Sequence, residues 1–157
     1  MNNCELEKAI RQDPVTSEVF LGVYPRDKIP NPTSETNCLI VNTANEGTQG
    51  QHWVAMYKDG RKYEFFDSYG RKAFANEFIG NNLYTYNSTL IQSPISAVCG
   101  EYCLYYLHYR TRGYSIDEIV DNLLSHTDTP DVVVKDFAEQ NFDLDTLRGN
   151  MYCLPRT

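Results

Sequence analysis

The 157-residue sequence lacks the features that mark several other protein classes. It has no apolar stretch of about 20 residues, so we expect no membrane-spanning helix. Residues 1–13 have neither a basic start nor an apolar core, so we expect no secretory signal. No run of Lys and Arg occurs and the formal net charge is −7. We therefore do not expect DNA as a partner, because affinity for phosphate backbones comes from basic side chains.

Cysteine is present but sparse, and its spacing argues against a metal site. Of the five cysteines, only Cys99 and Cys103 lie close together in the sequence. Structural zinc sites usually combine two such ligand pairs, so one pair predicts no metal. An odd cysteine count without a secretory signal favours free thiols in a protein that stays inside a cell.

Apolar runs and turn signals predict strands in the middle of the chain and helices on both sides of them. No linker divides the chain, so we expect residues 1–157 to form a single domain. Together these patterns predict an α+β fold with a central, mostly antiparallel sheet packed against helices. The expected strands are 38–41, 52–57, 62–67 and 88–92, and the expected helices are 5–12, 98–110, 115–124 and 131–141.

Two β-rich runs flank Asp59-Gly60, which is a strong signal for a β-hairpin with a two-residue turn. This turn would pair Lys58 with Arg61, and extending the ladder places His52 directly opposite Asp67. Directly opposed side chains lie on one face, with Cβ atoms about 4.5–5.5 Å apart. A carboxylate bonded to one histidine nitrogen orients the ring and leaves the other nitrogen to take a proton. A solvated pair at a strand end is the alternative.

Cys99 and Gly100 begin the expected helix 98–110, which is apolar nearly all round and therefore buried. The helix N-terminus favours a thiolate, the nucleophilic form of cysteine. Gly100 allows another group to approach the backbone closely. Gln92 lies seven residues earlier, and its uncharged amide suits an oxyanion donor beside the Cys99 N–H. A buried, inert cysteine is the alternative for Cys99 alone.

Two further histidines compete for the role of base. His108 lies on the buried helix and is expected to be a core residue, whereas His126 lies in a polar loop and is expected to be solvated. Neither has a carboxylate placed beside it by an identifiable turn. His52 with Asp67 is therefore the preferred pair.

The order histidine, acid, glutamine and cysteine, with Trp53 directly after the histidine, resembles the adenovirus-type endopeptidases, the adenain family. It is more distantly similar to the proteases that process ubiquitin-like modifiers, which usually have a shorter step between glutamine and cysteine. The resemblance covers residues 5–125 and rests most clearly on the segments 20–24, 38–44 and 92–100. The last of these reads QSPISAVCG.

This resemblance implies a thiol endopeptidase with Cys99 as nucleophile, His52 as general base and Gln92 as oxyanion donor. Asp67 would be the orienting acid, where adenain has Glu and the modifier-processing proteases usually have Asp. The family implies cleavage of capsid precursors of a virus or virus-like element at Gly-containing sites, because its groove is narrow. Trp53 would line that groove, and a structural Trp packed under the sheet is the alternative.

The family uses a viral peptide and DNA as cofactors, but this chain is acidic and its sequence requires no cofactor. A peptide activator stays open. We expect a monomer inside the host cell, in the nucleus or cytoplasm, or packaged in the virion, and not secreted. Three alternatives remain: a modifier-removing isopeptidase, an acetyltransferase with the same triad, and a non-catalytic virion binding module.

Overall fold

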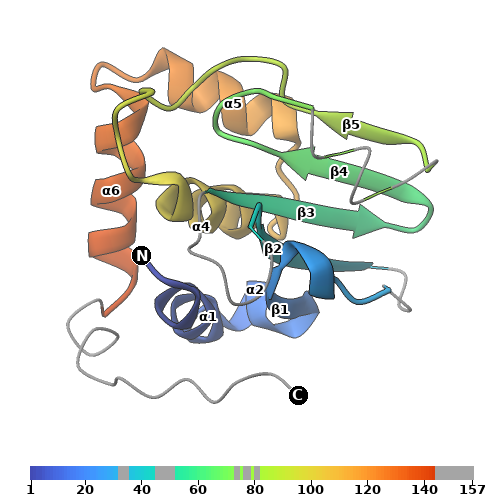
Figure 1. Ribbon diagram of the computed structural model, residues 1–157. Coiled ribbons are helices and arrows are strands. Elements are labelled where there is room, and N and C mark those ends of the chain that lie inside the picture. Colours follow the sequence, from blue (N-terminus) through green and yellow to red (C-terminus); the bar gives the residue numbers. More distant parts are fainter. Residues whose placement is uncertain (32–35, 45–51, 73–74, 76–78, 80–81, 144–157) are drawn as a thin grey trace.

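The computed structural model describes residues 1–31, 36–44, 52–72, 75, 79 and 82–143 (Figure 1). Its strands form one five-stranded sheet in the order β1-β2-β3-β4-β5. The central pairs, β2–β3 and β3–β4, are antiparallel, and the outer pairs, β1–β2 and β4–β5, are parallel. The strands are β1 (Phe20–Pro25), β2 (Thr36–Asn42), β3 (Trp53–Asp59), β4 (Lys62–Phe66) and β5 (Tyr84–Tyr86).

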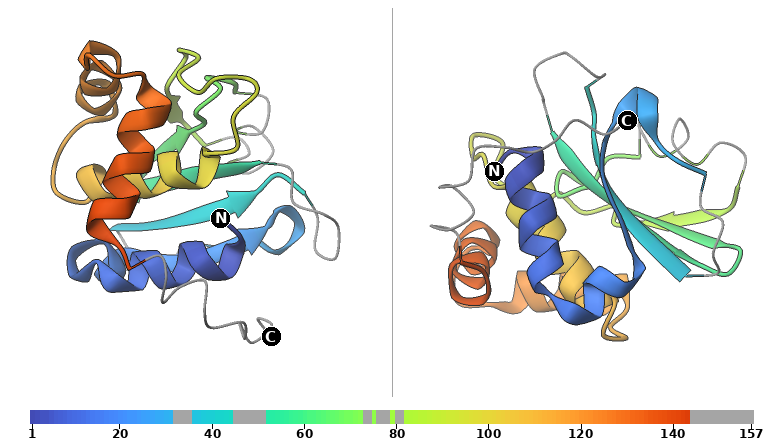
Figure 2. Two further views of the ribbon diagram at one scale, coloured as in Figure 1. Left: turned by 90° about the vertical axis from the view of Figure 1, so that its left-hand side faces the viewer. Right: turned by 90° about the horizontal axis from the view of Figure 1, so that it is seen from below.

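The helices confirm the expected α+β class, and α4 is the central one. It packs on β3 and on α6, while α1 packs on β1. Figures 1 and 2 show α4 lying between the strands and α6. The helical segments are α1 (Asn3–Gln12), α2 (Pro14–Val19), the 3-10 turn η1 (Arg26–Lys28), α4 (Cys99–Arg110), α5 (Ile116–Ser125) and α6 (Pro130–Asn141).

The sheet buries apolar side chains on both faces. On β3, Ala55 and Tyr57 join the core cluster that includes α4, whereas Val54 and Met56 join a second cluster on the other face. Successive side chains of a strand point to opposite faces, so burial of both sets means that both faces are covered. This explains why the run 38–41 is apolar without alternation.

Local capping signals explain where several helices begin. Asn2 and Glu5 form a capping box at α1, and Ser115 and Glu118 form the expected one at α5. Asp13 ends α1 but also caps α2, since its side chain accepts hydrogen bonds from the first-turn N–H groups. An Asp cap followed by Pro in the first turn is a strong start signal, so the Asp13-Pro14 pair both ends and begins a helix.

One expected strand is wrong. Residues 88–92 are not a strand, because the N–H groups of Ile91 and Gln92 both donate to the Ser68 carbonyl instead of to a neighbouring strand. The strand that pairs with β4 lies earlier in the chain, at β5.

Residues 144–157 of the expected single domain lie outside the described residues. Among the helices that the structure describes, none has the length and apolar character needed to cross a membrane.

Candidate active site

The hairpin of β3 and β4 differs in register from the prediction. Lys58 pairs with Tyr63 rather than with Arg61, so the loop residues are Gly60 and Arg61 instead of Asp59 and Gly60. Gly60 has a φ of 60°, as the first loop position of a type II′ turn requires. The shift amounts to two residues along β4. Side-chain direction alternates with period two, so every side chain keeps its predicted face.

His52 and Asp67 meet even though they are not a directly opposed pair. His52 lies just before β3 and Asp67 just after β4, and the Nε2 of His52 donates to Oδ1 of Asp67 over 2.7 Å. The exposed fractions are 6% for His52 and 0% for Asp67, so the pair is buried rather than solvated. The solvated alternative is therefore wrong. The second ring nitrogen of His52 is left to exchange a proton.

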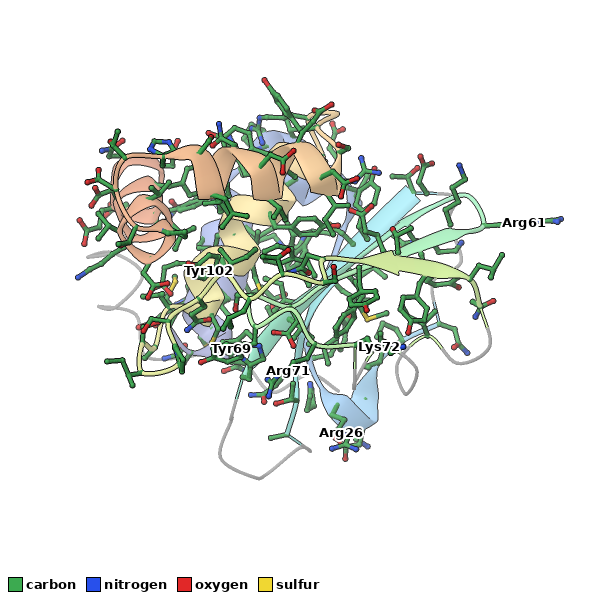
Figure 3. The ribbon with its side chains drawn as sticks, turned by 90° about the horizontal axis from the view of Figure 1, so that it is seen from above. Arg26, Arg61, Tyr69, Arg71, Lys72 and Tyr102 are labelled. Carbon is green, nitrogen blue, oxygen red and sulfur yellow. The ribbon has the colours of Figure 1, made fainter. Side chains whose placement is uncertain are left out.

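The Asp67 carboxylate is held by further donors on its own turn. Its Oδ1 accepts from the N–H of Tyr69 over 2.8 Å, and its Oδ2 lies 3.4 Å from Nε of Arg71. The Tyr69 ring stacks on the His52 ring with centroids 4.6 Å apart, and the Arg71 guanidinium lies 4.9 Å from the Tyr69 ring centre. Figure 3 shows Tyr69 and Arg71 beside each other. These contacts fix the plane and position of the imidazole.

The main chain around Asp67 is fixed by the segment that follows β5. The N–H of Asp67 donates to Oδ1 of Asn87 over 3.0 Å, and Nδ2 of Asn87 donates to the Asp67 carbonyl over 2.6 Å. Gly70 has a φ of 68°, and a Cβ there would lie 2.5 Å from the carbonyl carbon of Thr89. Only glycine therefore fits where this turn crosses residues 89–90.

Cys99 is the first residue of α4 and is partly buried. Burial raises the pKa of its thiol, but hydrogen bonds with the His52 side chain and the Trp53 N–H outweigh burial, so the pKa is lowered. Burial lowers the pKa of His52, but its hydrogen bonds and charge interactions with Asp67 and Cys99 outweigh burial and raise it. Both directions favour a thiolate beside an imidazolium.

The start of α4 is packed closely against α1. A Cβ at Gly100 would lie 3.0 Å from Cδ2 of Leu6 and 3.5 Å from Cβ of Met1. The expected close approach at Gly100 is therefore made by the first helix. A Cβ at this position would require the Leu6 side chain to shift.

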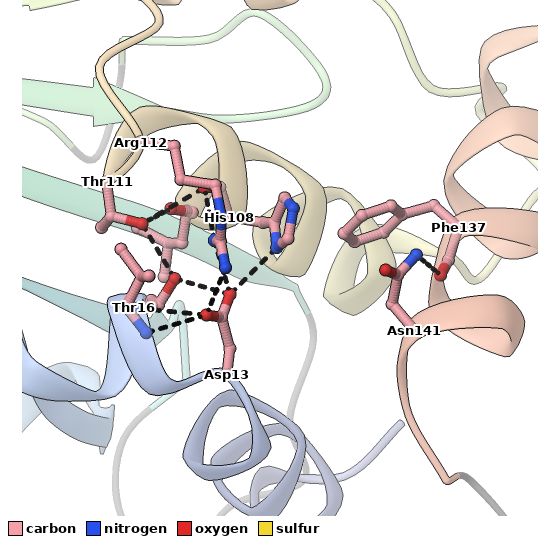
Figure 4. Close-up of polar contacts among 9 residues, drawn as sticks. Asp13, Thr16, His108, Thr111, Arg112, Phe137 and Asn141 are labelled. Carbon is pink, nitrogen blue, oxygen red and sulfur yellow. Dashed lines mark hydrogen bonds and ion pairs between the residues drawn. The ribbon is translucent and has the colours of Figure 1, made fainter.

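The opposite end of α4 is anchored by a buried carboxylate, shown in Figure 4. Asp13 accepts from both terminal nitrogens of Arg112, over 2.8 and 2.7 Å, and from Nδ1 of His108 over 2.9 Å. Burial raises the pKa of Asp13, but the hydrogen bonds from Arg112 and Thr16 outweigh it and hold that pKa well below its usual range. His108 is thus a structural residue, with a partner that sequence spacing did not reveal.

Gln92 is buried and its side chain is fully engaged. Its Oε1 accepts from the Ser68 hydroxyl over 2.6 Å, and its Nε2 donates to the carbonyl and hydroxyl of Ser96, each over 3.1 Å. The segment after Gln92 is tied to α6, because the Ser93 N–H donates to Asp131 over 3.3 Å. Asp131 also accepts from the Tyr102 hydroxyl over 2.6 Å.

Sequence reasoning missed Ser68, Tyr69, Asn87 and Asp131 as parts of this site. The only available signal was that Ser68 and Tyr69 directly follow the expected acid. Nothing in the local pattern indicates the long-range partners of Asn87 or Asp131.

Trp53 makes the contacts of a structural residue. Its indole N–H donates to the Met1 carbonyl over 3.2 Å, and its ring packs against the core cluster on the helical face of the sheet. These contacts match the structural alternative. Its role in lining a substrate groove stays a prediction.

The remaining cysteines differ from Cys99 in environment. Cys38 and Cys103 are free thiols and are buried. Burial raises the pKa of Cys38 to about 12 and raises that of Cys103 well above the usual value, so both stay protonated. Cys4 is disulfide-bonded, so the expectation of free thiols is wrong there. Within the described ranges, no group of three or more His, Cys, Asp or Glu could hold a metal ion.

Comparison with known proteins confirms the resemblance to adenovirus-type endopeptidases. No family model matches the chain. It is 30% identical over 123 residues to the protease of Bovine adenovirus 2 and 33% identical over 110 residues to that of Bovine adenovirus C serotype 10. These alignments cover 64% and 57% of this chain but only 59% and 56% of the relatives.

The fold is also found in a solved protease structure. The crystal structure of the ASFV pS273R protease matches 90% of this chain and covers 67% of the other chain, with a TM-score of 0.61 and 17% sequence identity. This similarity supports the α+β architecture. The geometry of the site itself comes from the residues described above.

Proposed function

We propose that this chain is a viral cysteine endopeptidase with Cys99 as nucleophile, His52 as general base and Asp67 as orienting acid. The observation that carries the proposal is the hydrogen-bonded series from the Cys99 thiol through His52 to the buried Asp67 carboxylate. A nucleophile, a base and a group that orients the base are the parts that covalent acyl transfer needs. Sequence similarity to adenovirus proteases supports the same class.

The mechanism follows from the roles of these residues. His52 holds the proton of Cys99, and the thiolate sulfur attacks the carbonyl carbon of the scissile peptide bond. The oxyanion that forms would accept hydrogen bonds from the Cys99 N–H and from the Gln92 amide. His52 then gives its proton to the leaving amine. Water attacks the thioester with His52 as base, which releases the acid and restores the thiol.

Gln92 must change one hydrogen bond to take part. In the resting enzyme both of its amide contacts go to Ser96. An oxyanion is a stronger acceptor than a neutral carbonyl or hydroxyl. The developing charge would therefore draw one N–H of Gln92 away from Ser96 when substrate binds.

The proposed substrates are capsid or other virion precursor proteins, cut at Gly-containing sites, in a host cell or a virion. We propose one protease domain that acts as a monomer without a required cofactor or DNA, with a peptide activator left open. The adenovirus relatives support a protein substrate. Trp53 is proposed to contribute to substrate binding.

The test is cleavage of a peptide library that samples Gly on both sides of the scissile bond. Four proteins are compared: wild type, Cys99→Ala, His52→Ala and Cys103→Ser, the last as a buried-cysteine control. We expect cleavage by wild type and Cys103→Ser only. Cleavage that survives Cys99→Ala, or no cleavage by wild type of any peptide or of virion precursors, would contradict the proposal.

A further inference from the structure

We propose that Ser68 is a positioning residue that aims the Gln92 amide for oxyanion stabilisation. The inference rests on the proposed function, because it assigns a purpose to the contacts of the expected oxyanion donor. Ser68 directly follows the orienting acid Asp67 and lies 24 residues from Gln92 in the sequence. Nothing in the local sequence pattern links the two.

Ser68 holds Gln92 at two points. Its hydroxyl donates to Oε1 of Gln92 over 2.6 Å, and its carbonyl accepts from the main-chain N–H of Gln92 over 2.9 Å. Both residues have exposed fractions of 1%, so water does not compete for these bonds. A buried side chain fixed through its main chain and its terminal oxygen has little freedom to rotate.

The contacts on the other side determine which way the amide faces. The Ser96 carbonyl is only an acceptor, so the group 3.1 Å away must be the nitrogen of Gln92. The oxygen of Gln92 therefore faces Ser68, whose hydroxyl must donate to it. The amide nitrogen faces Ser96, in the segment that leads from Gln92 into Cys99.

Asp67 and Ser68 thus serve the two halves of the site from adjacent positions. Asp67 orients the base through His52, and Ser68 orients the proposed oxyanion donor. The turn that carries both is fixed by Asn87 and by the tight crossing at Gly70. One rigid turn after β4 would therefore set the geometry of proton transfer and of charge stabilisation together.

Removal of the Ser68 hydroxyl should weaken turnover without inactivating the thiol. We expect Ser68→Ala to lower kcat by roughly 10- to 100-fold, less than the roughly 10²- to 10³-fold loss of the donor itself. Alkylation of Cys99 by iodoacetamide forms no oxyanion, so its rate and pH dependence should stay at the wild-type values. In a Gln92→Ala background, Ser68→Ala should cause no further fall in kcat.

Thr16→Val is the matched control, because the Thr16 hydroxyl is also buried but bonds to Asp13 and Thr111, far along the chain from the site. It should lower Tm while kcat is unchanged.

The side-chain amide resonance of Gln92, measured by NMR, gives a readout that needs no turnover. We expect it to shift in Ser68→Ala and not in Thr16→Val.

Each of three kinetic results would overturn the role of Ser68: an unchanged kcat in Ser68→Ala, an equal further loss in the Gln92→Ala background, or a parallel fall in alkylation rate. Failure of the proposed function would look different. Wild type would then cleave no peptide, while the shift of the Gln92 amide resonance would still report whether Ser68 holds that side chain. A resonance that does not shift would contradict the inference regardless of activity.

Discussion

The Nε2 of His52 donates to Oδ1 of Asp67 over 2.7 Å, although the two residues are not opposed in the β3–β4 ladder. The contact is made beyond the ends of both strands. There, the turn after β4 carries Asp67 back towards the residue that precedes β3. Tyr69 stacks on the imidazole from the same turn. The base is therefore oriented by a structured turn as well as by strand pairing.

Asp67→Asn tests this orientation. The change keeps the shape of the side chain but removes its charge, so the tautomer of His52 is no longer imposed by a carboxylate. We expect kcat/KM to fall by about 10²- to 10⁴-fold, as for loss of the orienting acid in other triads. Asp59→Asn, at an exposed hairpin position, is the control and should leave kcat/KM unchanged. Equal activity of Asp67→Asn and wild type would refute the role of Asp67.

The pH dependence of activity follows from the two pKa shifts. The pKa of Cys99 is lowered from 9.0 and that of His52 is raised from 6.5. Activity needs the thiolate and the imidazolium together, so kcat/KM should rise with pH as the pair forms and fall again as the imidazolium loses its proton. The acid limb should lie below pH 9.0, and the alkaline limb above pH 6.5. In Asp67→Asn the alkaline limb should move to lower pH, and an unmoved limb would contradict the assignment.

Much of this site could be predicted from sequence because its signals are local. The Asp59-Gly60 pair indicated the hairpin. The helical spacing of apolar residues over 98–110 placed Cys99 and Gly100 at the start of a helix. The register was wrong because the positive φ of Gly60 moved the loop by one position. The His52–Asp67 contact survived that error because a two-residue shift leaves side chains on the same face.

The parts that sequence could not predict depend on long-range hydrogen bonds. Residues 88–92 have a strand-like composition, but the N–H groups of Ile91 and Gln92 both bond to a single carbonyl, that of Ser68. The Ser93 N–H finds its partner, Asp131, 38 residues away. Such pairings depend on how the turn after β4, the segment before α4 and the start of α6 pack together. No local propensity encodes that packing.

Gly70→Ala tests the tight crossing beside Asp67. A Cβ at this position would overlap the main chain of Thr89 and Leu90, in addition to the strain of the left-handed backbone. We expect a loss of about 2–4 kcal/mol in the free energy of unfolding, with a large fall in kcat/KM. Gly60→Ala is a close control, since Gly60 has a φ of 60° and no atom within 4 Å of an added Cβ.

Gly60→Ala should lower the free energy of unfolding by only about 1 kcal/mol and leave kcat/KM unchanged. Chemical denaturation of both variants measures the difference. Equal losses would mean that the crossing with residues 89–90 adds nothing to backbone strain.

Asp13→Asn tests the anchor at the C-terminal end of α4. Removing this charge leaves Arg112 with a neutral partner in a largely buried site, which should cost about 2–4 kcal/mol in the free energy of unfolding. The pKa of Asp13 is lowered in the folded protein, so its contribution is present above its unfolded value of 3.8 and is lost as the pH falls below it. Urea denaturation at pH 7 and at pH 3 measures both effects.

Wild type should lose more stability than Asp13→Asn between pH 7 and pH 3, because the variant has no carboxylate to protonate at this position. If the two proteins lose the same amount of stability between pH 7 and pH 3, protonation of Asp13 does not contribute to the acid sensitivity. Glu7→Gln, at the partly exposed pair with Arg11, is the control and should follow wild type.

The central claim is that His52 activates Cys99, and the most direct measurement is the rate at which iodoacetamide alkylates each cysteine at pH 7. Mass spectrometry follows Cys38, Cys99 and Cys103 in one reaction, so the two buried thiols are internal controls. The account predicts that Cys99 reacts first in wild type and that its rate falls at least tenfold in His52→Ala. Preferential labelling of Cys103, or an unchanged Cys99 rate in His52→Ala, would contradict it.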